Sequence, residues 1–362
     1  MSDIYKLPWK LVQNKIKYYP GGREIDRFRG VEPPVDDGCP ECWVASDIPM
    51  RSAALRGDPN LGYAEVILPE GGKKYLHEVI EQAPEQILGP EHVKASGAKL
   101  GVLVKLLDAQ KQLGLQSHPS RAYAKAQFDS DYGKEESWYV IGVRDDTPEP
   151  PNVLMGFMEG VTREVFEEAY RRDDLPAMEG CCHKVPVRLG DLFFISAGLP
   201  HAIGGGVFVV EVQESSDITV GVQQAPKDLP EAERRRFEEQ LLGCYEYDGT
   251  SEAENLRRHR IVPRITREGS WGKETLLIGP EQTRYFSFTR LDAVKSVPLL
   301  DVRSAQVMIV LEGSGVIRTP EGELAVKKAD EVFLPFACNQ ASIIPTDGET
   351  LSVILAKPQA FD

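Results

Sequence analysis

The feature that most restricts the fold of this chain is a series of short apolar runs that end at Gly, Pro or Asp. Most of them are rich in β-branched or aromatic residues, which is typical of strands. No alternation of strands with helices is visible, and no G-x-G-x-x-G follows a strand to open a helix, so the sequence argues against a Rossmann fold. The chain is therefore predicted to be mainly β. The clearest of these runs are Ser137–Val143, Asp191–Ile195, Gly206–Gln213, Ala305–Glu312, Gly315–Arg318 and Glu331–Leu334.

Helical patterns interrupt only the first part of the chain. Lys74–Gln86 has apolar residues at helical spacing, and Arg163–Arg172 follows Thr162, a suitable N-cap. Pro230–Leu242 begins with proline at a plausible first helical position. Beyond about Ile261 the pattern is one of hairpins alone. The sequence thus predicts two β barrels, the first interrupted by helices.

Length and composition limit the number of domains and the class of partner. A chain of 362 residues suggests about two domains, and the acid-rich segment Gly249–Asn255 predicts a boundary between residues 1–250 and 251–362. The net charge of −14 argues against nucleic acid as the main partner. No apolar run approaches the roughly 20 residues of a membrane span, and the first residues lack the apolar block of a signal peptide. We expect a cytoplasmic protein with no membrane partner.

Six cysteines are too few for a disulfide scaffold in a chain of this length. Cys39, Cys42, Cys181 and Cys182 could supply four soft ligands to a structural zinc ion, because zinc accepts thiolates. However, adjacent cysteines do not make the usual tight knuckle. Unrelated thiols are the favoured interpretation.

Four polar side chains form the candidate site for chemistry. Gln116 and His118 are two residues apart, so an extended strand would point both to one face. Glu136 precedes an apolar strand, and His201 lies in a glycine-bounded turn that leads into another strand. Two imidazoles, a carboxylate and an amide oxygen suit Zn²⁺. From spacing alone, two unrelated buried histidines remain the alternative.

Three longer segments carry a resemblance to a known family. They are Leu103–Pro119 (LVKLLDAQKQLGLQSHP), Gly133–Ile141 (GKEESWYVI) and Gly190–Thr219 (GDLFFISAGLPHAIGGGVFVVEVQESSDIT). Together with shorter pieces in the same order, they resemble type I phosphomannose isomerase, a zinc-dependent family of two cupin barrels. The resemblance implies two cupin (jelly-roll) barrels, with helical insertions in the N-terminal one and no metal ligands in the C-terminal one. No histidine follows His259, so we expect the C-terminal barrel to be structural.

The family interconverts mannose 6-phosphate and fructose 6-phosphate through a cis-enediol. The resemblance implies one Zn²⁺ per chain, held by Gln116, His118, Glu136 and His201. It also implies catalytic roles for Lys134 and Glu211, and a small sugar phosphate as the partner. A solvated lysine and a carboxylate that only orients a ligand are the structural alternatives.

One position departs from the family pattern. The family places an active-site arginine where this chain has Gly221, after Ser216-Asp217-Ile218-Thr219-Val220. Either another cation replaces it, with Lys134 and Arg23 as candidates, or the substrate or activity has changed. The sequence therefore supports two functions, an isomerase of mannose 6-phosphate or a metal-bound cupin that binds a sugar or sugar phosphate without the standard isomerisation.

Overall fold

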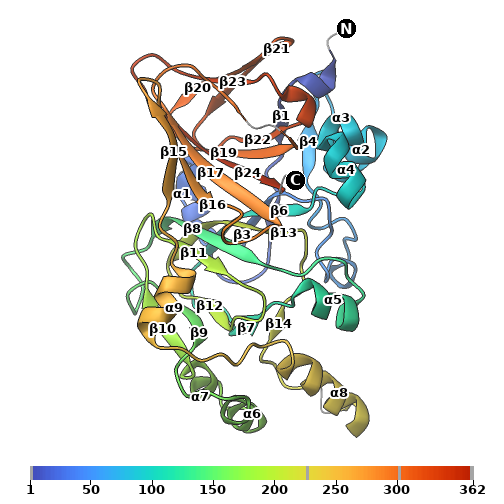
Figure 1. Cartoon of the computed structure of the whole chain (residues 1–362), viewed down its shortest axis with the longest axis vertical. Helices are drawn as coiled ribbons and strands as arrows, with labels where there is room; N and C mark the ends of the chain where they lie inside the picture. The colour runs from blue at the N-terminus through green and yellow to red at the C-terminus, as the bar shows by residue number, and fades with distance from the viewer. Residues whose placement is uncertain (1–2, 226–227, 301–302, 359–362) are drawn as a thin grey trace.

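The computed structural model describes residues 3–225, 228–300 and 303–358. Four antiparallel sheets dominate it, and helices lie at the periphery (Figure 1). The mainly β class predicted from the short apolar runs is confirmed. In the described ranges, no helix is both long and apolar enough to cross a membrane.

Two sheets built from the first part of the chain face each other. The six-stranded sheet has the order β11 (Leu192–Ile195), β8 (Glu136–Val143), β13 (Val207–Glu214), β6 (Val102–Ala109), β3 (Glu41–Ala45) and β2 (Lys15–Ile16). The five-stranded sheet has the order β10 (Cys182–Pro186), β9 (Asn152–Phe157), β12 (His201–Ile203), β7 (Gln116–Ser117) and β14 (Val220–Gly221). We call them the N-terminal sheet pair.

The other two sheets form the C-terminal sheet pair. The nine-stranded sheet has the order β15 (Arg264–Gly269), β16 (Gly272–Ile278), β17 (Phe286–Ala293), β24 (Leu351–Pro358), β19 (Gln306–Glu312), β22 (Glu331–Leu334), β1 (Trp9–Leu11), β4 (Glu65–Ile67) and β5 (Lys73–Tyr75). The four-stranded sheet has the order β18 (Val297–Pro298), β23 (Ser342–Pro345), β20 (Ser314–Thr319) and β21 (Gly322–Lys327).

The nine-stranded sheet draws on both ends of the chain. Trp9 pairs with Phe333 across β1 and β22, so residues before the predicted boundary at 250 complete a sheet made mostly of residues after it. The division into residues 1–250 and 251–362 stays a prediction.

Helices lie outside the sheets and follow local sequence signals. Thr162 caps α6, as predicted, by accepting a hydrogen bond from Val165 N at 3.5 Å. The helices are α1 (Arg23–Arg29), α2 (Leu76–Gln82), α3 (Pro84–Leu88), α4 (Pro90–Ser96), α5 (Arg121–Phe128), α6 (Arg163–Arg171), α7 (Leu175–Glu179), α8 (Glu231–Leu242) and α9 (Glu252–His259). Short 3₁₀ turns cover Ile4–Lys6, Ala54–Arg56 and Phe336–Cys338.

Two helix predictions need correction. The predicted helix Lys74–Gln86 is divided, because Pro84 cannot donate a backbone hydrogen bond and disfavours helical dihedrals at Ala83. Its first two residues belong instead to strand β5. The helix predicted from Pro230 begins at Glu231, so the proline is the N-cap.

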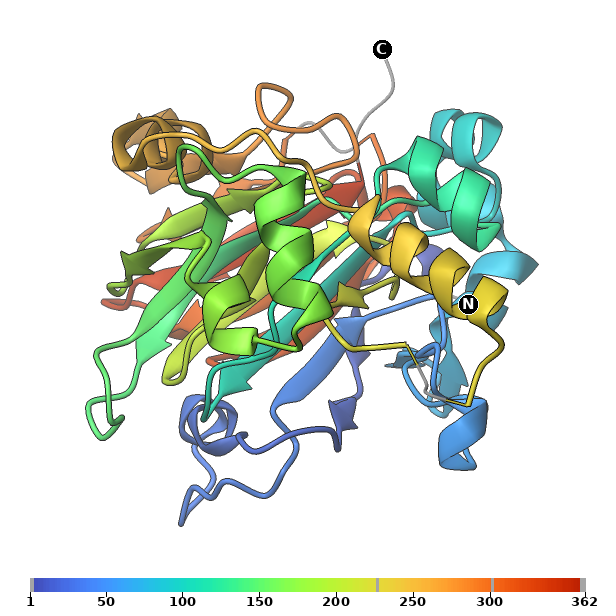
Figure 2. The same ribbon diagram turned by 90° about the horizontal axis from the view of Figure 1, so that it is seen from below.

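Apolar clusters explain how the sheets stack. One cluster fills the N-terminal sheet pair, and another fills the C-terminal pair. The largest lies between the six-stranded and nine-stranded sheets and includes Val210, Phe286 and Phe288. A fourth holds α6, α7 and α8 against the outer face of the five-stranded sheet, where Figure 2 shows them in front of the strands.

We expect Phe288→Ala to lower the free energy of unfolding by about 3–5 kcal/mol, because the ring is fully buried between the two central sheets. Chemical denaturation of both proteins measures the difference. Phe288→Leu keeps most of the buried volume and should lose less than half as much. An equal, small loss for both variants would contradict tight packing between the sheet pairs.

Candidate metal centre and cavity

A cavity of about 340 Å³ opens at one end of the N-terminal sheet pair. Its described lining includes six charged side chains, of which four are carboxylates and two are ammonium groups. They are Glu41, Lys105, Lys134, Glu136, Glu211 and Asp217. The volume falls within the usual range for small-molecule sites.

Strand alternation brings part of this charged set to one face. In β13, Val207 and Val209 point into the apolar interior, and Glu211 follows at the same two-residue spacing. Glu211 pairs in register with Lys105 of β6 and Trp138 of β8. The interior of the sheet pair is therefore apolar along most of its length and becomes charged at the cavity.

Three of the predicted metal ligands converge beside this face. His118, Glu136 and His201 are buried, and one ligand atom from each lies within 4.8 Å of the others. The two imidazole Nε2 atoms are 3.2 Å apart. His118 Nε2 lies 3.2 Å from Glu136 Oε2, and His201 Nε2 lies 3.5 Å from Glu136 Oε1.

Hydrogen bonds of the other ring nitrogens orient both histidines toward a common point. His118 Nδ1 lies 3.0 Å from the carbonyl of Ile218, and His201 Nδ1 lies 2.8 Å from that of Leu199. A carbonyl accepts only, so each Nδ1 carries the proton and each Nε2 presents a lone pair. Two lone pairs facing each other at this distance repel unless a cation lies between them. The donor set thus fits a metal ion.

Gln116 lies beside these donors. Its strand partners are His201 on one side and Gly221 on the other. The side-chain amide nitrogen is 3.4 Å from His201 Nε2, and turning the amide over presents its oxygen at the same place. The predicted four-residue set is therefore together in space.

Burial and neighbouring charges fix the protonation of the group. Burial, reinforced by the Lys134 ammonium, lowers the pKa of His118 to about 3, and burial also lowers the pKa of His201. Burial alone would raise the pKa of Glu136, but Lys134 and His118 hold it well below its usual range. Neutral imidazoles and an ionised carboxylate are the forms that bind a metal.

Lys134 lies within the same group. Its Nζ is 3.0 Å from Glu136 Oε2 and 2.9 Å from His118 Nε2. Glu136 Oε2 nevertheless accepts no hydrogen bond of normal geometry from a described residue. A buried carboxylate oxygen without such a bond has room for a further partner, and beside two imidazole lone pairs an ion fits that place.

Glu211, the second predicted catalytic residue, has a neighbour beside each oxygen, although its Oε2, like that of Glu136, accepts no hydrogen bond of normal geometry from a described residue. Trp138 Nε1 donates to Oε1 at 3.1 Å, and Lys105 Nζ lies 3.1 Å from Oε2. Burial raises the pKa of Glu211 despite the nearby ammonium. Burial would lower the pKa of Lys105, but Glu211 and Glu41 raise it instead. A carboxyl group with a raised pKa beside a metal group is suited to proton transfer.

We expect Lys105→Met to lower the free energy of unfolding by about 3–5 kcal/mol. The lysine is 4% exposed, and its loss leaves the buried carboxylates of Glu211 and Glu41 without their cation. The double variant Lys105→Met with Glu211→Gln removes one of those charges and should recover part of the loss. Denaturant titration of the three proteins measures the free energy of unfolding of each. If the double variant is no more stable than Lys105→Met, the two residues do not interact directly through their charges.

Gly221 stands where the family has an arginine, and Arg23 was one of the two cations expected to replace that arginine. The backbone of Gly221 is extended, in strand β14, and is not among the described glycines with positive φ. A positive φ is therefore not the reason for glycine here. Arg23 makes two 2.7 Å hydrogen bonds to Asp146 and does not line the cavity. Of the two proposed substitutes for the family arginine, only Lys134 is at the site.

Thiols take no part in this group. All six cysteines are free, and within the described ranges the one group that could hold a metal is His118, Glu136 and His201. Cys42 instead lies buried against Arg29, at 3.0 Å from its Nη2. The favoured interpretation of unrelated thiols agrees with this arrangement.

Several residues that line the cavity were not predicted as site residues from the sequence. Lys105 is the clearest, because it is a single charged residue within the apolar run Val102–Leu107. A lysine there must be paired when the strand is buried, so its position was a usable signal. Tyr19, Glu41 and Asp217 also line the cavity, but their surrounding sequence carries no comparable pattern.

No family model matches this chain, but individual proteins do. It is 30% identical over 195 residues to a probable mannose-6-phosphate isomerase, GmuF, of Bacillus subtilis, covering 54% of either protein. It is 26% identical over 245 residues to the mannose-6-phosphate isomerase ManA of the same organism, covering 67% of this chain and 72% of that one. The chain thus matches about half the length of the first relative.

Solved structures extend the likeness to the whole fold. The mannose 6-phosphate isomerase from Bacillus subtilis aligns over 96% of this chain and 99% of its own, with a TM-score of 0.73 and 20% identity. A putative mannosephosphate isomerase from Archaeoglobus fulgidus aligns over 98% of each chain, with a TM-score of 0.72 and 16% identity. The predicted resemblance to the mannose-6-phosphate isomerases is confirmed.

Proposed function

We propose that this chain, a relative of the mannose-6-phosphate isomerases, is itself an aldose–ketose isomerase that interconverts mannose 6-phosphate and fructose 6-phosphate. The observation that carries the proposal is the convergence of two unprotonated imidazole nitrogens and Glu136 beside Lys134. We further propose that each sheet pair is a cupin barrel and that the helices are insertions in the first.

Zinc is the metal that we propose, bound by Gln116, His118, Glu136 and His201. Two imidazoles, a carboxylate and an amide oxygen are ligands that zinc accepts in catalytic sites. When bound, the ion supplies Lewis acidity to the carbonyl and hydroxyl oxygens of the sugar.

The chain's own residues would move the proton. We propose that Glu211 takes the proton from C2, which leaves an enediolate, that the hydroxyl proton of O2 passes to O1 through the cis-enediol, and that Glu211 returns its proton at C1. Its raised pKa makes it a stronger base than an ordinary carboxylate, and the Trp138 and Lys105 contacts hold it in orientation. The Lys134 ammonium would stabilise negative charge that develops on the sugar oxygens.

A coupled assay tests this function. Purified, zinc-loaded protein should convert mannose 6-phosphate to fructose 6-phosphate, and chelation followed by zinc addition should abolish and restore the rate. A folded, zinc-loaded protein without measurable conversion would refute the proposed function.

The charges of the cavity favour a second candidate function. Both lysines in its described lining are already paired with buried carboxylates, and Gly221 supplies no side chain. A phosphate dianion is recognised by cations. The alternative is a metal-bound cupin that binds or converts a different sugar. Free mannose and other aldoses in the same assay distinguish the two, and a kcat/KM at least tenfold higher for a free aldose would favour the alternative.

We propose a small-molecule partner and a cytoplasmic location. The acidic net charge disfavours nucleic acid, and six free thiols suit a reducing compartment.

A further inference from the structure

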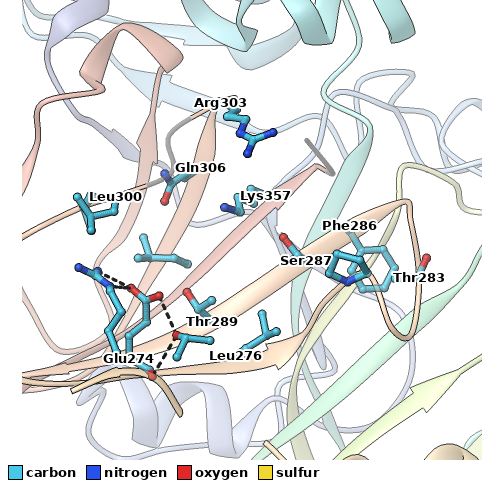
Figure 3. A pocket seen from close by; sticks show the side chains of 15 residues that line it. Glu274, Leu276, Thr283, Phe286, Ser287, Thr289, Leu300, Arg303, Gln306 and Lys357 are labelled. Carbon is cyan, nitrogen blue, oxygen red and sulfur yellow. Dashed lines mark hydrogen bonds and ion pairs between the residues drawn. The ribbon is translucent and has the colours of Figure 1, made fainter. Parts of the chain in front are cut away.

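A second cavity, of about 400 Å³, opens into the C-terminal sheet pair. Its wall follows five neighbouring strands of the nine-stranded sheet, in the order β15, β16, β17, β24 and β19. Figure 3 shows Gln306 toward one end of this cavity, with Leu276 and Thr289 opposite it. The sequence predicts only a structural role for this part of the chain.

The interior of the sheet pair changes from apolar to polar at this cavity. On β17, Leu291 belongs to the apolar cluster, while Thr289 and Ser287 continue the same face into the cavity. On β19, Met308 belongs to that cluster, and Gln306 precedes it at the same two-residue spacing. Two strands therefore each turn a polar side chain toward the cavity.

Strand β24 lies between these two polar strands. Its Leu355 pairs with Thr289 on one side and with Met308 on the other. Leu355 and Leu276 also line the cavity, so the wall combines neutral polar groups with apolar surface. Sites for small molecules commonly have that composition.

Three polar side chains of the lining lack a hydrogen-bond partner among the described residues. Gln306 is only 4% exposed, and its side-chain amide makes no hydrogen bond to any of them. The hydroxyl groups of Ser287, which is also buried, and of Thr289 likewise make none. Buried polar groups normally have partners, so a ligand or water in the cavity must supply them.

The charged groups of the described lining are already engaged. Glu274 Oε2 lies 2.6 Å from Arg267 Nη2, and Oε1 accepts a hydrogen bond from Thr266 Oγ1 at 3.0 Å. Neither Arg303 nor Lys357 is without a partner. The described lining groups whose hydrogen-bonding capacity is unused are therefore neutral. Because burying a charge without a new partner is costly, this lining favours an uncharged ligand.

Amide and hydroxyl groups suit one class of uncharged ligand. Each of them both donates and accepts hydrogen bonds, as the hydroxyl group of a sugar does. Carbon-bound hydrogens of the same ligand would contact the apolar wall at Leu276 and Leu355. The described lining has no imidazole, and its single carboxylate is paired, so it offers no metal-ligand set.

We propose that this cavity binds a neutral polyhydroxylated compound, a free sugar or a sugar alcohol, without a metal. The amide of Gln306 and the hydroxyl groups of Ser287 and Thr289 exchange hydrogen bonds with hydroxyl groups of the ligand. The C-terminal sheet pair is then a binding module in addition to a packing partner. This inference does not depend on the proposed isomerase activity, because it places the ligand outside the metal cavity.

An NMR titration of the zinc-loaded full chain tests the proposal, with D-glucitol and methyl α-D-glucopyranoside as probes. Neither has a free carbonyl group, so neither can be isomerised. The first is a sugar alcohol and the second is a closed sugar ring, so the tighter of the two identifies the form that binds.

Two further compounds test the predicted chemistry of the ligand. D-gluconate is the charged counterpart of glucitol, and 1,6-hexanediol lacks the inner hydroxyl groups. We expect both to bind about tenfold more weakly than the tighter neutral probe, since one brings an unpaired charge and the other leaves polar groups of the cavity without partners. No binding of either neutral probe at millimolar concentration, or equally tight binding of gluconate, would overturn the proposal.

Variants assign the binding to this cavity. Gln306→Leu, which keeps most of the side-chain volume, should weaken the tighter probe about tenfold, and Ser287→Ala should weaken it several-fold. Gln340→Leu is the matched control, since Gln340 is exposed and does not line the cavity. Any isomerase activity should stay within twofold in all three. Unchanged binding in folded Gln306→Leu and Ser287→Ala would overturn the proposal.

A last variant separates this cavity from the metal cavity. Replacement of His118 and His201 with alanine should leave the affinity for the tighter probe within twofold, because neither residue lines the C-terminal cavity. Loss of binding in that folded double variant, with binding retained in Gln306→Leu, would place the probe in the metal cavity and overturn the proposal.

Discussion

Replacing His118 and His201 together with alanine should remove the bound metal and lower kcat/KM for the isomerised sugar on the order of 10³-fold or more. Both Nε2 lone pairs disappear, and Glu136 and Gln116 alone cannot hold the ion tightly. A bound metal contributes several kcal/mol of charge stabilisation in the transition state, and each 1.4 kcal/mol is a factor of ten. Metal content by elemental analysis and initial rates measure the two effects.

The control for this variant is His77→Ala, which removes a histidine outside the group. It should keep one metal per chain and full activity. Melting temperatures of all the variants separate loss of metal from loss of fold. One metal per chain in the folded double variant would show that the ion binds elsewhere.

The candidate metal ligands could be predicted from the sequence because the residue patterns that indicate them are local. Gln116 and His118 share a face by strand alternation alone, and the turn before His201 is marked by glycines. Residue spacing could not show that three distant segments come together, because the pairing of β12 with β7 is a tertiary contact. The resemblance supplied that step.

The features missed by sequence analysis depend on which face of a strand is buried. Ser287, Thr289 and Lys357 alternate with apolar residues, which is equally typical of a strand with one solvated face. Here the apolar face is buried between the two central sheets, and the polar face lines a cavity of the C-terminal sheet pair instead of facing open solvent. The strand Trp9–Leu11 was missed for a related reason, because three residues carry no periodicity.

Gly221→Arg should raise kcat on mannose 6-phosphate by about tenfold to a hundredfold, with a smaller change in KM. One preorganised donor to a developing oxyanion is worth on the order of 10²–10³ in kcat, and the introduced side chain would recover part of that. The effect falls on kcat because such a contact strengthens in the transition state.

The backbone at Gly221 accepts the substitution. A Cβ there would lie 2.8 Å from Gln223 Oε1, the end of a flexible side chain, and 3.7 Å from the carbonyl of Leu115. Gly221 pairs with Gln116, so the new side chain would leave the sheet on the same face as that candidate ligand. Thr219, two residues earlier, already lines the cavity. The guanidinium would therefore reach the cavity without backbone strain.

Gly221→Met is the matched control, because it adds a side chain of similar length without the charge. It should leave kcat unchanged or lower, with a melting temperature close to that of Gly221→Arg. Equal rates in the two variants would show that bulk, not charge, governs this position. If the parent chain does not convert mannose 6-phosphate, the isomerase function is wrong, and a stably folded Gly221→Arg that also fails to convert it would show that the missing arginine is not the cause. In that case the paired lysines of the cavity support binding of a different sugar.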